Sequence, residues 1–229
     1  SFDKQYLTIG INGMVEAAEF LNIPISDNDV YKNFLKENLK TIYDLNKEAR
    51  QQYGYMFNTE FVPAENLGVK NAKWDRRDGL KVSRECYNSY FYVVEDANID
   101  FVDKFHLHGS EVIQYLDGGS ALHLNLEEYL TPVQYMMLLD NAARVGCNYF
   151  CTNVKVTVCN ECSKITKRTQ SSCGHCGSTH IDYATRVIGY LKRVSSFSSS
   201  RQKEHNLRYY HVDSHSSATK PELAQHLER

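Results

Sequence analysis

The chain alternates between two patterns of apolar and polar positions. Short runs rich in β-branched and aromatic residues predict buried strands, and runs with an apolar residue every three or four positions predict helices. Within the run 121–126, a period of two places His123 and Asn125 on one face. The predicted strands are 6–11, 57–62, 89–94, 121–126 and 148–158, and the predicted helices are 14–21, 26–54 and 131–146. Strands that alternate with helices predict an α/β fold.

Local signals predict where the two longest helices begin and end. Ser26 followed by Asp29 resembles a capping box at the start of the longer helix, and Gly54 is suited to end it. Thr131 supplies an N-cap for the second helix, and Gly146 would close it. Both helices are therefore expected to be independent, well-bounded elements of the fold.

Composition narrows the class of protein. The 229 residues, 42% hydrophobic and 24% charged, indicate one large or two small globular domains rather than a disordered chain. The formal net charge of −2 gives no long-range field for a polyanion, which disfavours a dedicated nucleic-acid binder. No run approaches about 18 apolar residues, and no basic-then-apolar signal peptide is evident, so we expect a cytoplasmic protein without a membrane partner.

Four of the seven cysteines form two C-x-x-C pairs separated by ten residues. Each pair lets one tight turn present two thiolates to the same ion, and two pairs at this spacing are typical of a tetrahedral zinc site. Four protein ligands leave no open position, so the zinc would be structural. Two redox dithiols are a less favoured alternative, and His175 or His180 could replace a thiolate. The expected ligands are Cys159, Cys162, Cys173 and Cys176.

Directly after the second cysteine pair stands the sequence RVIGYL, residues 186–191, followed by Arg193 and Arg201. In this order, the cysteine pairs and the glycine resemble the C-terminal part of the anaerobic (class III) ribonucleotide reductases. Further motifs in the family's order extend the resemblance to roughly residues 6–211. These upstream motifs are residues 7–13, 58–65, 118–125 and 146–150.

The resemblance implies that Gly189 carries a stored radical. Glycine suits this role because an α-carbon radical must become planar, and a Cβ would crowd that geometry. The family's glycine loses a hydrogen atom to a separate AdoMet-dependent iron–sulfur activase. The radical then passes to a cysteine, whose thiyl form takes the 3′ hydrogen of a ribonucleoside triphosphate and permits loss of the 2′ hydroxyl. The implied enzyme is thus an anaerobic ribonucleoside-triphosphate reductase that makes deoxyribonucleoside triphosphates for DNA replication.

The resemblance also implies the architecture: the later half of a ten-stranded α/β barrel, with the radical loop directed toward its centre. The expected divisions are a partial reductase barrel at 1–158, a zinc module at 159–180, the radical loop and C-terminal segment at 181–211, and a flexible tail at 212–229. The family's thiyl cysteine lies upstream of the matched region. We therefore expect activity only together with an N-terminal reductase portion, in an oligomer.

Substrate contacts are expected in the loop that follows the strand 57–62. Its backbone N–H groups could bind phosphates, as in the phosphate loop of the reductase barrel, although an ordinary strand-exit loop is an equally good reading. Glu60 and Glu65 could serve in acid–base steps at the ribose hydroxyls, or could simply be exposed. The candidate substrate-binding residues are Pro63, Ala64, Glu65, Asn66 and Gly68.

Two other functions compete with this interpretation. One is a spare glycyl-radical subunit that repairs a reductase cleaved by oxygen at its own glycine. Such a part needs little beyond the radical loop, whereas this chain carries several strands and helices of a barrel. The other is a zinc-ribbon binding module without radical chemistry, supported only by three basic residues in the loop between the cysteine pairs. That module would leave the upstream motifs unexplained.

Overall fold

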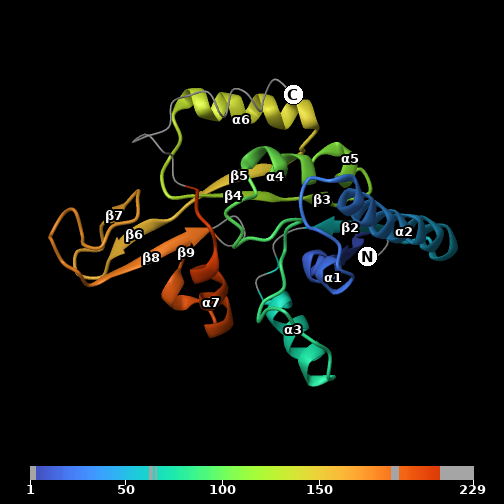
Figure 1. Ribbon diagram of the computed structural model, residues 1–229, viewed down its shortest axis with the longest axis horizontal. Coiled ribbons are helices and arrows are strands. Elements are labelled where there is room, and N and C mark those ends of the chain that lie inside the picture. Colours follow the sequence, from blue (N-terminus) through green and yellow to red (C-terminus); the bar gives the residue numbers. More distant parts are fainter. Residues whose placement is uncertain (1–3, 62–63, 65, 187–190, 212–229) are drawn as a thin grey trace.

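A parallel sheet forms the centre of the molecule, which is known from a computed structural model that describes residues 4–61, 64, 66–186 and 191–211. One group of strands has the order β1-β2-β3, and β4 pairs with β5. The amide of Ala121 donates to the carbonyl of Phe61 (3.1 Å), so β3 and β4 continue one another beside β2 (Figure 1). The parallel strands are β1 (Tyr6–Gly10), β2 (Met56–Phe61), β3 (Gly119–Ser120), β4 (Leu122–Leu126) and β5 (Phe150–Val154). The expected α/β class is confirmed.

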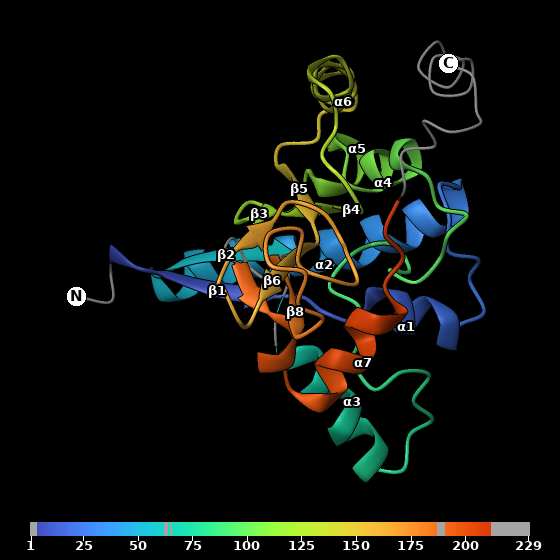
Figure 2. The same ribbon diagram turned by 90° about the vertical axis from the view of Figure 1, so that its left-hand side faces the viewer.

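Helices lie on both sides of this sheet. In Figure 1, α4, α5 and α6 lie above it and α1, α3 and α7 below it, and Figure 2 shows the same separation from the side. The helices are α1 (Met14–Phe20), α2 (Asp29–Tyr53), α3 (Leu67–Arg77), α4 (Phe101–Leu107), α5 (Ser110–Ile113), α6 (Pro132–Val145) and α7 (Ser199–Leu207). Within the described residues, none is long and apolar enough to cross a membrane.

A second, antiparallel sheet follows the parallel one in the chain. Its strand order is β7-β6-β8-β9, and a short 3-10 helix, η2 (Val194–Ser196), leads from it to α7. Its own buried apolar cluster is small, comprising Val156, Val158 and Ala184. The strands are β6 (Val156–Cys159), β7 (Ile165–Thr166), β8 (Ile181–Arg186) and β9 (Leu191–Arg193).

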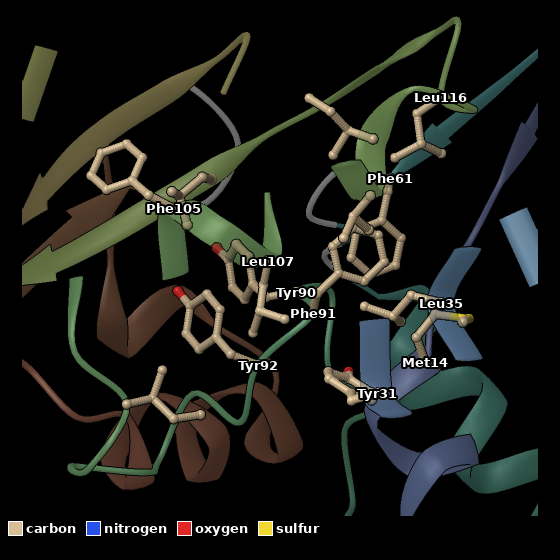
Figure 3. Packing of buried hydrophobic residues seen from close by; sticks show 14 of the residues in the cluster. Met14, Tyr31, Leu35, Phe61, Tyr90, Phe91, Tyr92, Phe105, Leu107 and Leu116 are labelled. Carbon is tan, nitrogen blue, oxygen red and sulfur yellow. The ribbon is translucent and has the colours of Figure 1, made fainter. Parts of the chain in front are cut away.

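The main core fills the space between the parallel sheet and its helices (Figure 3). Leu122 and Leu124 are fully buried there, as the alternation of β4 requires. Phe61 stacks on Phe91 with ring centroids 3.9 Å apart, and His108 lies 5.1 Å from the Phe91 ring. One face of the parallel sheet therefore packs against this core, and the side chains between these core residues lie on the opposite face.

The predicted strand at 89–94 is wrong. These residues form an irregular buried segment, in which Phe91 stacks on Phe61 while the Tyr92 hydroxyl donates to the carbonyl of His123 (2.9 Å). Consecutive aromatic side chains here point to different partners, and the backbone joins no ladder. The aromatic composition therefore reflected burial and not strand pairing.

Two element boundaries also differ from the prediction. The long helix α2 begins after Asn28, whose Oδ1 accepts from the amide of Tyr31 (2.9 Å), so Asn28 and not Ser26 is the cap. The predicted strand 148–158 is two strands, β5 and β6, because the chain changes partner from β4 to the antiparallel sheet. The N-cap at Thr131 and the closing Gly146 of α6 are confirmed, and Gln134 completes a capping box at Thr131.

Candidate functional site

The four predicted cysteine ligands converge. Their sulfur atoms all lie within 4.8 Å of one another. The Cys159 and Cys176 sulfurs are 3.6 Å apart, as are those of Cys162 and Cys173. A tetrahedral ion with metal–sulfur bonds of about 2.3 Å needs sulfurs about 3.8 Å apart. The cluster therefore fits zinc, with all four ligands supplied by the chain.

Backbone amides lie close to two sulfur atoms of the cluster and favour the thiolate form of Cys173. The amide nitrogen of Cys162 lies 3.5 Å from the Cys159 sulfur, and the amide nitrogen of His175 lies 3.4 Å from the Cys173 sulfur. Hydrogen bonds from the backbone of Cys176 and His175 lower the pKa of Cys173 to about 6. His180 Nδ1 contacts Glu161 (2.7 Å) and lies outside the four-sulfur cluster.

The face of the parallel sheet turned away from the core carries polar side chains. Thr59, whose hydroxyl accepts from Asn46 of α2 (2.8 Å), faces the core, so its neighbours in β2 point the other way. In β4, His123 and Asn125 share that opposite face, as predicted, and the parallel register aligns them with Cys151 and Asn153. We call this set the polar face: Asn58, Glu60, His123, Asn125, Cys151 and Asn153.

The end of β8 docks on the polar face through a buried amide. Asn153 Oδ1 accepts from the Thr185 hydroxyl (2.8 Å) and from the Arg186 backbone amide (2.9 Å), and its Nδ2 donates to Asn125 Oδ1 (2.8 Å). Asn153 and Thr185 are both fully buried. No local sequence signal marks these two residues, because the contact joins segments about thirty residues apart.

Positive charges gather beside His123. Burial, followed by the charges of Arg208, Arg186 and Arg201, lowers the pKa of His123 to about 4, so its imidazole is neutral at pH 7. Burial would raise the pKa of Glu204, but the two arginines of α7 and its C-cap lower it. Arg208 holds that carboxylate through two hydrogen bonds of 2.9 Å, and Arg201 Nη1 lies 3.3 Å from it.

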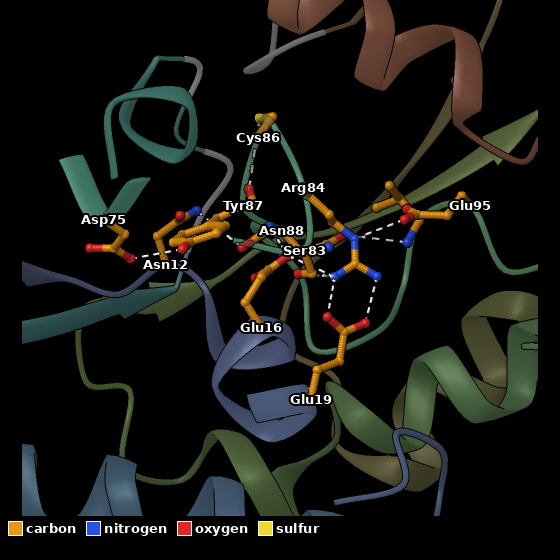
Figure 4. A network of polar contacts seen from close by, with 11 residues as sticks. Asn12, Glu16, Glu19, Asp75, Ser83, Arg84, Cys86, Tyr87, Asn88 and Glu95 are labelled. Carbon is orange, nitrogen blue, oxygen red and sulfur yellow. Dashed lines mark hydrogen bonds and ion pairs between the residues drawn. The ribbon is translucent and has the colours of Figure 1, made fainter. Parts of the chain in front are cut away.

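The irregular segment that contains residues 83–95 lies close to the carboxyl ends of β1 and β2, since the amide of Gly13 donates to the Asn88 carbonyl (3.0 Å) and the amide of Ala64 to the Ser89 hydroxyl (3.3 Å). Figure 4 shows its polar contacts. Arg84 binds Glu19 through two bonds of 2.6 and 2.7 Å and Glu95 through one of 2.8 Å. Asn88 donates through its amide side chain to Glu16 (2.7 Å). These buried and half-buried contacts tie the segment to α1, directly after β1, and so fix it beside the strand ends.

A cavity of about 310 Å³ lies between this segment and α7. Its lining includes Cys86, Tyr90, Arg201 and Glu204, of which Tyr90 is also 6.0 Å from the His123 ring. Cys86 is buried, and burial raises the pKa of its thiol. The cavity therefore opens beside the polar face, at the same end of the sheet as the predicted substrate loop.

The structure describes part of that predicted loop. The amide of Ala64 lies 3.3 Å from the Ser89 hydroxyl, so it already has a protein partner. Asn66 is the N-cap of α3 but makes no side-chain cap bond, and Gly68 packs so tightly that an added Cβ would lie 2.5 Å from the Tyr87 carbonyl oxygen. Gly68 therefore has a packing role.

Of the remaining predicted site residues, the structure describes Glu60 but not Pro63, Glu65 or Gly189. Glu60 is half-buried on the polar face, whereas Pro63 and Glu65 lie outside the described residues. Gly189 also lies outside them, among residues 187–190. The two residues that flank this gap, Arg186 and Leu191, are register partners in the antiparallel pair β8–β9. Both ends of the Gly189 segment are thus fixed next to each other.

Comparison with known proteins gives one consistent result. A family model described as "Anaerobic ribonucleoside-triphosphate reductase" matches residues 1–211. The search of curated proteins gave no match. A solved structure named "Anaerobic ribonucleotide reductase" is 29% identical, with a TM-score of 0.79, and the match covers 92% of this chain and 35% of that one.

Structures of the anaerobic ribonucleotide reductase from Thermotoga maritima are also similar. The structure in complex with dATP and CTP is 29% identical, with a TM-score of 0.73 and coverage of 88% of this chain and 34% of that one. The structure with glycerol in the active site is 28% identical, with a TM-score of 0.72 and coverage of 91% and 33%. The chain thus spans about a third of the length of the proteins it resembles.

Proposed function

The chain belongs to the anaerobic ribonucleoside-triphosphate reductase family, and from this premise we propose that it supplies the radical-storing C-terminal part of such an enzyme. Gly189 would hold the radical. The complete enzyme would convert ribonucleoside triphosphates to deoxyribonucleoside triphosphates, and would need an N-terminal portion with the thiyl cysteine. We place this oxygen-sensitive chemistry in the cytoplasm.

The observation that carries the proposal is the position of the two residues that flank the Gly189 segment. Arg186 and Leu191 are register partners in the antiparallel sheet, whose strand β6 ends at Cys159 of the four-cysteine cluster. The backbone amide of Arg186 donates a hydrogen bond to Asn153 on the polar face. A radical stored between these residues would be held beside the side chains that line the parallel sheet. Zinc at the cluster would be structural, because the four thiolates fill its coordination sphere.

The polar face supplies candidate groups for the substrate. Glu60 lies on it at the end of β2, and His123 is held neutral, so that it can donate or accept a hydrogen bond without carrying charge. Glu65 would act with Glu60 in acid–base steps at the ribose hydroxyls. Residues 63–68 would contact the phosphates, aided by the N-terminus of α3, while Gly68 also keeps the helix close to Tyr87.

The proposed partners follow from the part of the family that this chain covers. An AdoMet-dependent iron–sulfur activase would remove one hydrogen atom from the α-carbon of Gly189. The N-terminal portion would pair with the chain in an oligomer.

A spare subunit for repair is not favoured, because the match extends over residues 1–211 and not only over the radical segment. A zinc-ribbon module is not favoured for the same reason.

The test combines this chain with an N-terminal reductase portion under strictly anaerobic conditions, with the activase and AdoMet. We expect an electron paramagnetic resonance doublet from the single hydrogen left on Gly189, and formation of deoxyribonucleotides. Gly189→Ala should abolish both while zinc content and circular dichroism stay unchanged. In air, the radical form should be cut at Gly189, which releases a fragment of about forty residues. A doublet that persists in Gly189→Ala would refute the assignment.

A further inference from the structure

Building on the proposed function, we propose that Asn153 is a positioning residue for radical transfer, because it fixes the backbone amide of Arg186, from which the chain continues toward Gly189. Its side chain is fully buried and joins three parts of the chain: β4, β5 and the end of β8. Its Oδ1 accepts two hydrogen bonds, of 2.8 and 2.9 Å, and its Nδ2 donates one of 2.8 Å. A buried amide that satisfies three partners defines one geometry.

The contact acts on the main chain and not only on side chains. Asn153 accepts from the backbone amide of Arg186, which is the last described residue before the Gly189 segment and the register partner of Leu191. This hydrogen bond fixes the position of the last backbone amide of β8, from which the chain continues into the Gly189 segment. Only two residues separate Arg186 from Gly189, so a shift at this point would be passed on to the radical carbon.

The C-terminal segment also contacts the place where the end of β8 meets Asn153, which we call the junction. The Thr185 hydroxyl, besides donating to Asn153, lies 3.5 Å from the Tyr210 hydroxyl of the C-terminal segment. That segment is itself anchored to β4, because the amide of His211 donates to the carbonyl of Asn125 (3.0 Å). The junction is therefore a closed chain of contacts between β4, β5, β8 and the C-terminal segment.

In the proposed radical transfer, a hydrogen atom would leave the thiol of the cysteine in the N-terminal portion and bond to the α-carbon radical of Gly189, which leaves the cysteine as a thiyl. This transfer requires the reacting atoms to lie within about 3–3.5 Å, and a displacement of about 1 Å can cost about 100-fold in rate. The proposed activase would form the radical beforehand, in a complex of its own with this chain. Loss of Asn153 should therefore impair radical transfer more than radical storage. A residue with a merely structural role would lower stability and leave the yield of product per radical unchanged.

The experiment uses the complete reductase, with this chain and its N-terminal portion, and measures deoxyribonucleotide formed per spin of the doublet. The variants are Asn153→Ala and Thr185→Val. Thr157→Val is the matched control, because Thr157 is also a buried strand threonine with two hydrogen bonds, to the Arg168 carbonyl and from the Gln170 amide, each 2.9 Å. It lies in β6, and among the described residues it shares no hydrogen bond with Asn153, Thr185 or Arg186.

We expect Asn153→Ala to lower product per spin by about 10- to 100-fold, and Thr185→Val by about 3- to 10-fold, because the latter keeps the bond from Arg186 to Asn153. Thr157→Val should stay within about two-fold of the unmodified enzyme. If Asn153→Ala does not fold or carries no spin, the comparison of Thr185→Val with Thr157→Val decides.

Two results would overturn the proposal while leaving the proposed function intact. One is a normal doublet with unchanged product per spin in both test variants. The other is an equal loss in Thr185→Val and Thr157→Val, which would show a general effect of removing a buried hydroxyl. An unmodified enzyme that forms no doublet at Gly189 would instead overturn the proposed function, and this inference with it.

Discussion

At the scale of single residues, close packing and burial explain several positions near the strand ends. Gly68 lies where any side chain would meet the backbone of Tyr87, and the Gly68 carbonyl also accepts from the Tyr87 amide (3.2 Å). His108 is buried among aromatic rings, and its Nε2 has no hydrogen-bond partner among the residues that the structure describes. Gly68 thus packs against the segment 83–95 at Tyr87, and His108 packs against the same segment at Phe91.

Gly68→Ala should destabilise the protein by about 1–3 kcal/mol, because the new Cβ would lie 2.5 Å from a backbone oxygen that cannot move freely. Urea unfolding at pH 7 measures the change. Gly10→Ala is the control, since an added Cβ there would have no atom of the described residues within 4 Å, and its unfolding free energy should stay within about 0.5 kcal/mol of that of the original protein. Equal stabilities of the two variants would contradict the packing role.

The buried His108 should make stability fall in mild acid. Burial, aided by His123, lowers the pKa of His108 to about 3, whereas the unfolded chain has the usual value near 6.5. Below pH 6.5 only the unfolded state gains this proton, so the contribution present at neutral pH is lost as the pH falls. From pH 7 to 5.5 the loss is about 1 kcal/mol for this one group.

The measurement is urea unfolding at both pH values for the original protein and for His108→Gln. The fall in unfolding free energy between pH 7 and 5.5 should be about 1 kcal/mol smaller in the variant. Effects of acid on the thiolate cluster are common to both proteins and cancel in this comparison. An identical fall in both would show that His108 does not titrate as proposed.

At the scale of elements, the antiparallel sheet depends on its cysteine cluster. It contributes three buried apolar side chains of its own, and its end strand β9 has three residues. So small a core gives little stability by itself, and small modules are commonly held together by a metal. Because β8 leads directly into the Gly189 segment, the metal would stabilise the position of that segment through the sheet.

Cys162→Ser should remove stoichiometric zinc and lower the melting temperature by roughly 5–10 °C, because metal binding is coupled to folding of the sheet. Elemental analysis and thermal unfolding measure the two effects, and amide exchange should rise in β6 and β8. Cys147→Ser is the matched control, since Cys147 lies outside the cluster and should retain the metal. Full zinc content in Cys162→Ser would exclude this cysteine as a ligand.

At the scale of the whole molecule, the parallel sheet has an open edge at β1. All five residues of β1 are exposed, among them Tyr6, Leu7 and Ile9. The amide of Ile11 donates to the carbonyl of Glu60 (3.0 Å), so by alternation the amide of Thr8 points to the open edge. An exposed strand with apolar side chains favours pairing with another chain, which fits the proposed N-terminal portion.

Thr8→Pro should weaken association with the N-terminal portion by at least about tenfold, because proline removes an edge N–H while leaving the pairing of β1 with β2 intact. Sedimentation or light scattering of the mixed portions measures the affinity. Thr8→Val keeps the N–H and should bind normally. Equal affinities of the two variants would show that the β1 edge is not the contact.

The sequence by itself determined the features that depend on neighbouring residues. The cap and end of α6 follow from Thr131 and Gly146, the face shared by His123 and Asn125 follows from the period of β4, and the cysteine spacing predicts the four sulfurs that converge. Each of these properties is set within a few residues of chain or by one tight turn. The family motifs added the radical role of Gly189, which stays a prediction.

Only the tertiary structure decided which distant residues meet. The contact of Asn153 with Thr185, and the grouping of three arginines around His123, depend on how β5, β8 and α7 pack together. The irregular path of residues 89–94 was also decided there, since its aromatic side chains find partners on separate elements. Such contacts carry no local signal, because burial and partner are fixed by segments that come together only when the whole chain folds.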